Sequence, residues 1–200
     1  MIYKKNSNDL HKNYWEEKYI ENTTGWDIGA ISTPIKEYID QLKNKELKIL
    51  IPGAGNGYEA EYLFNNGFTA VDVIDIATQP LENLKKRVPS FPDNQLIQTN
   101  FFEHHKTYDL IIEQTFFCAL HPTLRNEYVA KMNSLLNPNG KLTGLLFNFE
   151  LTQEGPPFGG SSTEYLQLFS KYFNIKTIDK CHNSIKPRLG NELFFIFERN

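Results

Sequence analysis

The sequence has little cysteine, no excess of positive charge and no long hydrophobic run. Its 200 residues include two cysteines, which are too few for a disulfide framework and are not spaced as metal ligands. The formal net charge is -3 and the pI is about 6.0, so no basic surface for nucleic acid is indicated. No apolar run approaches the roughly 18 residues that a membrane span requires. We therefore expect no metal, no nucleic-acid partner and no membrane partner.

The chain also lacks an apolar leader, internal repeats and linker-like segments. It begins with the polar stretch MIYKKNSNDLHKN, so we expect no signal peptide and a cytoplasmic protein. Hydrophobic residues make up 40% and charged residues 22%, which is typical of a globular protein. The length suits one domain. We therefore expect a single domain over residues 1–200 that acts as a monomer on a small molecule.

The stretch that indicates a function is KILIPGAGNGY at residues 48–58. An apolar strand pattern leads there into Gly53, Gly55 and Gly57, and a helical pattern follows. Glycine permits backbone angles that other residues avoid and leaves room for a ligand beside the chain. Asp75 follows Gly57 by 18 residues, at the end of AVDVIDI, where a carboxylate can accept hydrogen bonds from ribose hydroxyls. This order of loop, helix and acid indicates a nucleotide-like ligand on a parallel α/β sheet.

The glycine spacing differs from that of a dinucleotide-binding loop. Dehydrogenases favour GxGxxG, whose third glycine lets the helix point its N-terminus at a pyrophosphate. Position 58 is Tyr in this chain, which argues for adenosine with an uncharged or zwitterionic tail. S-adenosylmethionine is the common ligand of that kind, and a nicotinamide cofactor is the less favoured alternative.

Helical and strand patterns alternate along the chain. Two helices are predicted before the first strand, one over residues 11–21 and one after Ser32 or Thr33. The patterns then predict strands at 48–52, 70–75, 95–98, 108–113, 141–149, 175–181 and 193–198, with helices at 57–66, 78–87, 122–137 and 161–172. No helix is predicted between or after the last two strands. We therefore predict a Rossmann-like α/β fold of the class I methyltransferase type, with a seven-stranded, mostly parallel sheet, one antiparallel strand and helices on both faces.

Several short segments carry a resemblance to a known family. The aromatic residues of YWEEKYIENTTGWDIG precede the loop IPGAGNGYEAEYL, which is followed by VIDIA, NFF, EQTFFCAL and GPPF. The most specific of these is EQTFFCAL at residues 113–120, because eight residues in register are hard to obtain from strand composition alone. In these segments the chain resembles the thiopurine S-methyltransferase-like family of class I S-adenosylmethionine-dependent methyltransferases, particularly its thiol and halide methyltransferase branch.

The resemblance implies a site for S-adenosylmethionine. Residues 1–45 would form an N-terminal helical lid whose aromatic faces attract the positively charged sulfonium. Asn100 and Gln114 stand where the family has Asp and Tyr. These two substitutions leave cofactor binding intact and bear on which acceptor the site takes. The resemblance implies cofactor contacts for Trp15, Tyr19, Trp26, Gly53, Gly55, Gly57, Asp75, Asn100, Phe101 and Gln114.

The predicted activity is methyl transfer to a small soft nucleophile, a thiol first and a halide or thiopurine next. Attack by an anion on a sulfonium methyl removes charge, so a dry site favours it without a general base. No catalytic residue is therefore singled out. Two alternatives are O- or N-methylation of a small metabolite, with His121 as a base, and cofactor binding without catalysis. Arg125, Arg188 and His182 are candidates for an acceptor anion, although surface positions are the simpler expectation.

Overall fold

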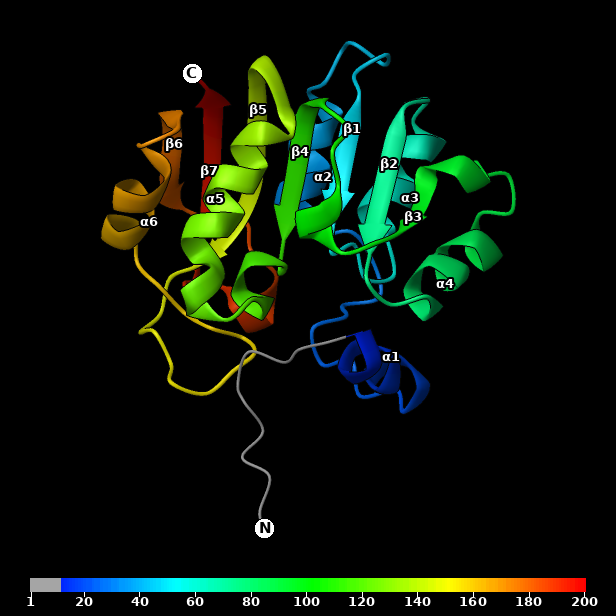
Figure 1. Ribbon diagram of the computed structural model, residues 1–200, viewed down its shortest axis with the longest axis horizontal. Helices are drawn as coiled ribbons and strands as arrows, with labels where there is room; N and C mark the ends of the chain where they lie inside the picture. Colours follow the sequence, from blue (N-terminus) through cyan, green and yellow to red (C-terminus); the bar gives the residue numbers. More distant parts are fainter. Residues whose placement is uncertain (1–11) are drawn as a thin grey trace.

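The computed structural model of the protein describes residues 12–200. Its fold is a seven-stranded sheet with helices on both faces (Figure 1). The strand order is β3-β2-β1-β4-β5-β7-β6. Neighbouring strands are parallel from β3 to β5, and β7 is antiparallel to both β5 and β6. The predicted single antiparallel strand is thereby confirmed. The strands are β1 (Ile49–Pro52), β2 (Val71–Asp75), β3 (Leu96–Gln98), β4 (Tyr108–Gln114), β5 (Leu136–Phe147), β6 (Phe173–Lys180) and β7 (Glu192–Arg199).

Each predicted helix is present, and the helices divide between the two faces of the sheet. Ile39, Leu63 and Leu84 belong to one buried cluster, which joins α2, α3 and α4 to the sheet. Tyr128 and Phe169 belong to the other cluster, which joins α5 and α6 to the opposite face. Residue 11 of the first predicted helix lies outside the described residues. The helices are α1 (Lys12–Ile20), α2 (Thr33–Asp40), α3 (Tyr58–Asn65), α4 (Gln79–Arg87), α5 (Arg125–Ser134) and α6 (Ser162–Phe169).

The boundary between α5 and β5 differs from the prediction. The helix predicted over 122–137 is a 3-10 turn, Pro122–Leu124, followed by the shorter α5. Residues 137–140, which lie at the end of the predicted helix and before the strand predicted at 141–149, belong to β5. Tyr108 pairs with Leu136 and Leu110 with Lys141, so these four residues lie opposite Asp109 alone. Asn137 Nδ2 donates a hydrogen bond to Asp109 Oδ1 at 2.7 Å. A bulge of this kind adds residues to one strand without ending it.

The parallel strands bring the ends of distant segments to one edge of the sheet. The strand order reverses between β1 and β4, and ligands of open α/β sheets bind at the carboxyl ends of the strands near such a reversal. The glycine loop follows β1, Asp75 ends β2 and Gln114 ends β4. Helix α1 lies beyond this edge, next to α4 (Figure 1). Within residues 12–200, no helix has the length and apolar character needed to cross a bilayer.

Candidate functional site

A cavity of about 840 Å³ lies at the carboxyl ends of the parallel strands. This volume falls within the range of small-molecule sites. Gly57, alone among the residues predicted to contact the cofactor, does not line it. Its φ is +67°, and a Cβ there would lie 2.9 Å from Leu84 Cδ2, so Gly57 serves the packing of the loop on α4. The predicted residues that line the cavity are Trp15, Tyr19, Trp26, Gly53, Gly55, Asp75, Asn100, Phe101 and Gln114.

The glycine loop passes close to the segment that follows β4. Gly53 has a φ of +56°, which other residues rarely adopt. A Cβ on Gly53 would lie 2.1 Å from Phe116 Cδ2, a distance that no side chain tolerates. Glycine is therefore required at this position both by the backbone angle and by the approach of the Phe116 ring.

Asp75 joins the tip of β2 to the glycine loop. Its Oδ2 accepts a hydrogen bond from the Gly55 amide at 3.1 Å, and its Oδ1 accepts one from the Ala77 amide at 2.9 Å. Burial raises the pKa of Asp75 to about 6, and these amide donors limit the shift. The carboxylate faces the cavity with the loop already held in place.

Asn100 and Phe101 occupy the cavity wall beyond β3. The Asn100 side chain caps the following 3-10 turn, because its Oδ1 accepts a hydrogen bond from the Phe102 amide at 3.0 Å. The side-chain nitrogen of Asn100, Nδ2, takes no part in that hydrogen bond. Phe101 is buried, and its ring meets that of Phe116 edge to face at 5.1 Å between centroids. Phe101 therefore both packs in the core and lines the cavity.

Three aromatic rings of the N-terminal segment form one wall of the cavity. The Trp15 and Trp26 rings meet edge to face at 5.3 Å, and the Tyr19 and Trp26 rings do so at 5.9 Å. A Cβ on Gly55 would lie 3.2 Å from Tyr19 Oη. The aromatic cluster formed by Trp15, Tyr19 and Trp26 thus lies directly over the glycine loop.

Polar contacts fasten this segment to the body of the protein at both sides of the glycine loop. Glu16 Oε2 accepts a hydrogen bond from the Thr78 amide at 2.8 Å, at the start of α4. Asn56 of the glycine loop donates from its side-chain amide to Asp27 Oδ2. Both contacts join residues far apart in the sequence, so they form only when the segment lies over the cavity.

Two further contacts fasten the segment at the opposite side of the cavity. Ser32 Oγ donates to Gln114 Oε1 at 2.5 Å, at the tip of β4. Arg188 Nη2 donates to the Trp26 carbonyl at 2.7 Å. The side chain of Gln114 is therefore occupied by the N-terminal segment.

The segment after β4 is held by a buried acid, Glu113, which is fully inaccessible to solvent. Its Oε1 accepts hydrogen bonds from the amides of Phe116 and Phe117 at 2.8 and 2.9 Å, and Tyr128 Oη donates to Oε2 at 2.5 Å. Burial raises the pKa of Glu113 to about 7. Thr115 has a φ of +60°, which is rare for a β-branched residue. Glu113 thus supports a turn of unfavourable backbone geometry in the cavity wall.

The side of the cavity near β4 and β5 is largely apolar. Cys118 is buried, and burial raises the pKa of its thiol. His121 caps the 3-10 turn that follows it, because its Nδ1 accepts a hydrogen bond from the Thr123 amide at 3.3 Å. The lining residues of this side include Cys118, Ala119, Leu120, His121, Leu124, Phe147, Pro156 and Pro157.

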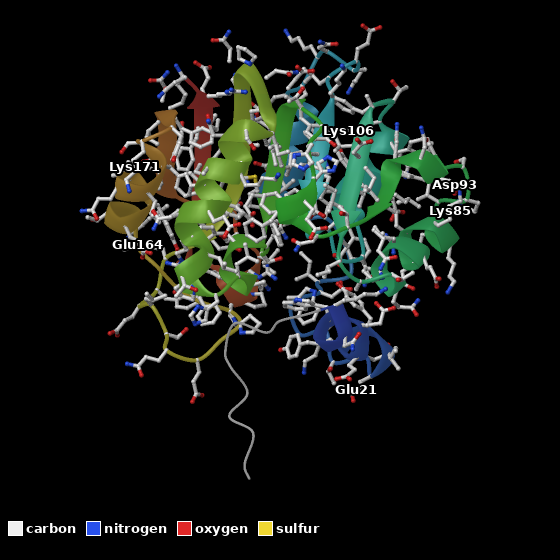
Figure 2. The ribbon with its side chains drawn as sticks, viewed as in Figure 1. Glu21, Lys85, Asp93, Lys106, Glu164 and Lys171 are labelled. Carbon is white, nitrogen blue, oxygen red and sulfur yellow. The ribbon has the colours of Figure 1, made fainter. Side chains whose placement is uncertain are left out.

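The expectation of surface positions is wrong for the two arginines. The Arg125 side chain is 3% exposed and forms an ion pair with Glu164 of α6 (Figure 2). Its Nη2 donates a hydrogen bond to the Gly159 carbonyl at 2.7 Å. Arg188 lines the cavity, whereas His182 is exposed. Spacing along the chain cannot show these contacts, because each joins elements that are distant in sequence.

Glu59, which is not among the residues predicted to contact the cofactor, lines the cavity from the first turn of α3. Its place directly after the glycine loop is a signal that could have drawn attention to it. The basic residues of α4, by contrast, do not line the cavity. Lys85 pairs with Asp93 at 2.7 Å at the far end of that helix (Figure 2).

Comparison with known proteins finds one family model and a set of related enzymes. The model described as Thiopurine S-methyltransferase (TPMT) matches residues 10–197. A probable thiol methyltransferase 2 of Arabidopsis thaliana is 29% identical over 184 residues, covering 89% of this chain and 81% of that protein. A thiocyanate methyltransferase 1 of Brassica oleracea is 26% identical with the same coverage.

A solved structure shares the fold at low sequence identity. It is a 1,6-didemethyltoxoflavin-N1-methyltransferase of Burkholderia thailandensis with bound 1,6-didemethyltoxoflavin and S-adenosylhomocysteine. The TM-score is 0.72 at 18% identity, and the match covers 94% of this chain and 87% of the other.

Proposed function

The chain belongs to the thiopurine S-methyltransferase family, and from that premise we propose that its cavity binds S-adenosylmethionine together with a small soft nucleophile, a thiol first. The observation that carries this proposal is the convergence of three features on one cavity. The glycine loop, the strand-end acid Asp75 and the N-terminal aromatic cluster all line it. An adenosine with a charged sulfur needs this combination of close backbone, hydrogen-bond acceptor and aromatic faces.

The cofactor supplies a methyl group on a positively charged sulfur, and the protein's residues bind it and exclude water. We infer that Gly53 and Gly55 lie against its methionine end and Asp75 against its ribose. Asn100 and Phe101 would hold the adenine, and the N-terminal lid, residues 1–45, would cover the sulfur with Trp15, Tyr19 and Trp26. The polar contacts that fasten this segment over the cavity support a closed arrangement. Gln114 would contribute through its backbone, because its side chain is bonded to Ser32.

The acceptor side of the cavity supports a nucleophile that arrives as an anion. Its lining is largely apolar, and a dry site favours the neutralisation of a thiolate or halide against a sulfonium. His121 Nδ1 is engaged with Thr123, so the alternative with an enzyme base would have to use Nε2. The thiol and thiocyanate methyltransferases among the relatives act on nucleophiles of this class.

Replacing Asp75 by Ala is expected to weaken S-adenosylmethionine binding by about 1.5–3 kcal/mol, the usual contribution of hydrogen bonds to a charged group. Isothermal titration calorimetry measures this loss directly. Asp75→Asn is the matched variant, because it keeps the shape and an acceptor oxygen for one of the two amides, Gly55 or Ala77. An unchanged dissociation constant in a folded Asp75→Ala protein would remove Asp75 from the site.

A panel of acceptors, assayed by release of S-adenosylhomocysteine, tests the activity itself. With thiols we expect kcat/KM to rise with pH in step with the pKa of each thiol, and the rise to move to lower pH for a more acidic aryl thiol. A halide should show no such rise, because it is charged at every accessible pH. A profile that stays fixed while the acceptor pKa varies, and that is lost in His121→Ala, would favour O- or N-methylation with an enzyme base.

A further inference from the structure

Two side chains of opposite charge line the cavity near the glycine loop, and neither is fully partnered. Glu59 is 8% exposed, although it is a carboxylate. Across residues 12–200 no other residue donates a hydrogen bond to this carboxylate or forms an ion pair with it. Burial raises the pKa of Glu59 to about 7, and the nearby charge of Arg188 acts in the opposite direction. Glu59 is therefore a buried acid that faces a cavity without a partner of its own.

Arg188 lies close enough to influence Glu59, yet it uses only part of its hydrogen-bonding capacity. Its side chain is 11% exposed, and Nη2 donates to the Trp26 carbonyl at 2.7 Å. Nη1 is buried and lies 3.6 Å from Glu192 Oε1 without a hydrogen-bond partner, and Nε also donates to no residue in the described part of the chain. Arginine presents a planar fork of donors that suits a carboxylate.

The other carboxylates of the cavity wall are engaged or distant. Asp75 accepts hydrogen bonds from two backbone amides. Asp27 accepts from the Gly29 amide at 2.7 Å and from the side chain of Asn56. Glu127 belongs to α5, on the opposite face of the sheet from α3. Glu59 is thus the acid beside the glycine loop that remains open to a cation.

We propose that Glu59 and Arg188 form a subsite for a zwitterionic α-amino-acid group, with Glu59 binding its ammonium and Arg188 its carboxylate. The subsite rests on the proposed function, and its place beside the glycine loop assigns the group to the methionine end of the cofactor. Buried charges are costly unless they are paired, and each would gain the opposite charge from the ligand. The same zwitterionic group could belong to an acceptor that is a thiol-bearing α-amino acid, and the experiment separates these two sources.

The test compares the binding of S-adenosylhomocysteine with that of 5′-methylthioadenosine, which shares the adenosine and lacks the amino-acid group. Glu59→Gln and Arg188→Gln are each expected to weaken S-adenosylhomocysteine at least tenfold and 5′-methylthioadenosine less than twofold, measured by calorimetry. Glu61→Gln is the matched control, since Glu61 lies on the same helix and pairs with Arg87 on the surface. We expect this control to bind both ligands as the native protein does.

Three results would overturn the proposal. Equal weakening of both ligands would indicate a structural role, and unchanged affinity for S-adenosylhomocysteine would remove the subsite from the cofactor. The affinity for S-adenosylhomocysteine could also stay unchanged while kcat/KM falls for a thiol-bearing α-amino acid and not for a plain alkanethiol. In that case the subsite belongs to the acceptor, and its assignment to the cofactor is wrong. Failure of the native protein to bind S-adenosylhomocysteine would instead refute the proposed function, because that measurement does not depend on either variant.

Discussion

Deleting residues 1–30 is expected to lower the turnover of methyl transfer at least about a hundredfold, while the sheet stays folded. The deletion removes the aromatic cluster and the contacts of Glu16 and Asp27 with the body of the protein. The fully packed members of both hydrophobic clusters begin at Ile35, so the core loses little. An open cavity admits water and leaves the cofactor poorly oriented, and both effects slow a displacement that depends on a closed site.

The measurement combines turnover with far-UV circular dichroism, which reports the folded sheet. Trp26→Ala tests the aromatic cluster without a deletion and should reduce turnover in the same direction. Glu21→Ala is a suitable control, because Glu21 is exposed on the outer side of the segment (Figure 2). The proposed lid would be refuted if the deleted protein retained turnover, or if protease cleaved residues 12–30 equally fast with and without cofactor.

Replacing Glu113 by Leu is expected to lower the free energy of unfolding by about 3–5 kcal/mol. The change leaves the Phe116 and Phe117 amides and the Tyr128 hydroxyl without their acceptor in a fully buried place. The turn at Thr115 then loses its support, so we also expect weaker cofactor binding. Chemical denaturation measures the first effect and calorimetry the second.

The same acid makes stability depend on pH. The pKa of Glu113 rises from 4.5 to about 7 on folding, so between these values the folded protein keeps a proton that the unfolded chain releases. The resulting stabilisation is fully present below about pH 4.5 and is lost as pH rises through 7. The stability difference between the native protein and Glu113→Gln should therefore change by roughly 3 kcal/mol across this window. A constant difference from pH 4.5 to 8 would contradict this expectation, and the exposed Glu103→Gln serves as the control.

The sequence by itself determined the order of the helices and strands and the position of the glycine loop. These features follow from local physics: apolar periodicity selects helix or strand, and the backbone angles at Gly53 require glycine whatever lies nearby. Asp75 was predictable for a similar reason, because it is the acid at the carboxyl end of a buried strand. The antiparallel final strand was predictable because no α-helix separates β6 from β7, where the structure has only the 3-10 turn Lys186–Arg188.

Only the tertiary structure decided which polar groups meet across the cavity. The contact between Arg188 and the Trp26 carbonyl joins residues 162 positions apart, and that between Ser32 and Gln114 joins residues 82 positions apart. Such pairs depend on how the sheet brings loops together, and no periodicity in the chain encodes that distance. For the same reason an acid such as Glu59 looks like an ordinary surface residue in the sequence. Its burial beside an arginine arises only when α3 and the segment before β7 pack at the same edge of the sheet.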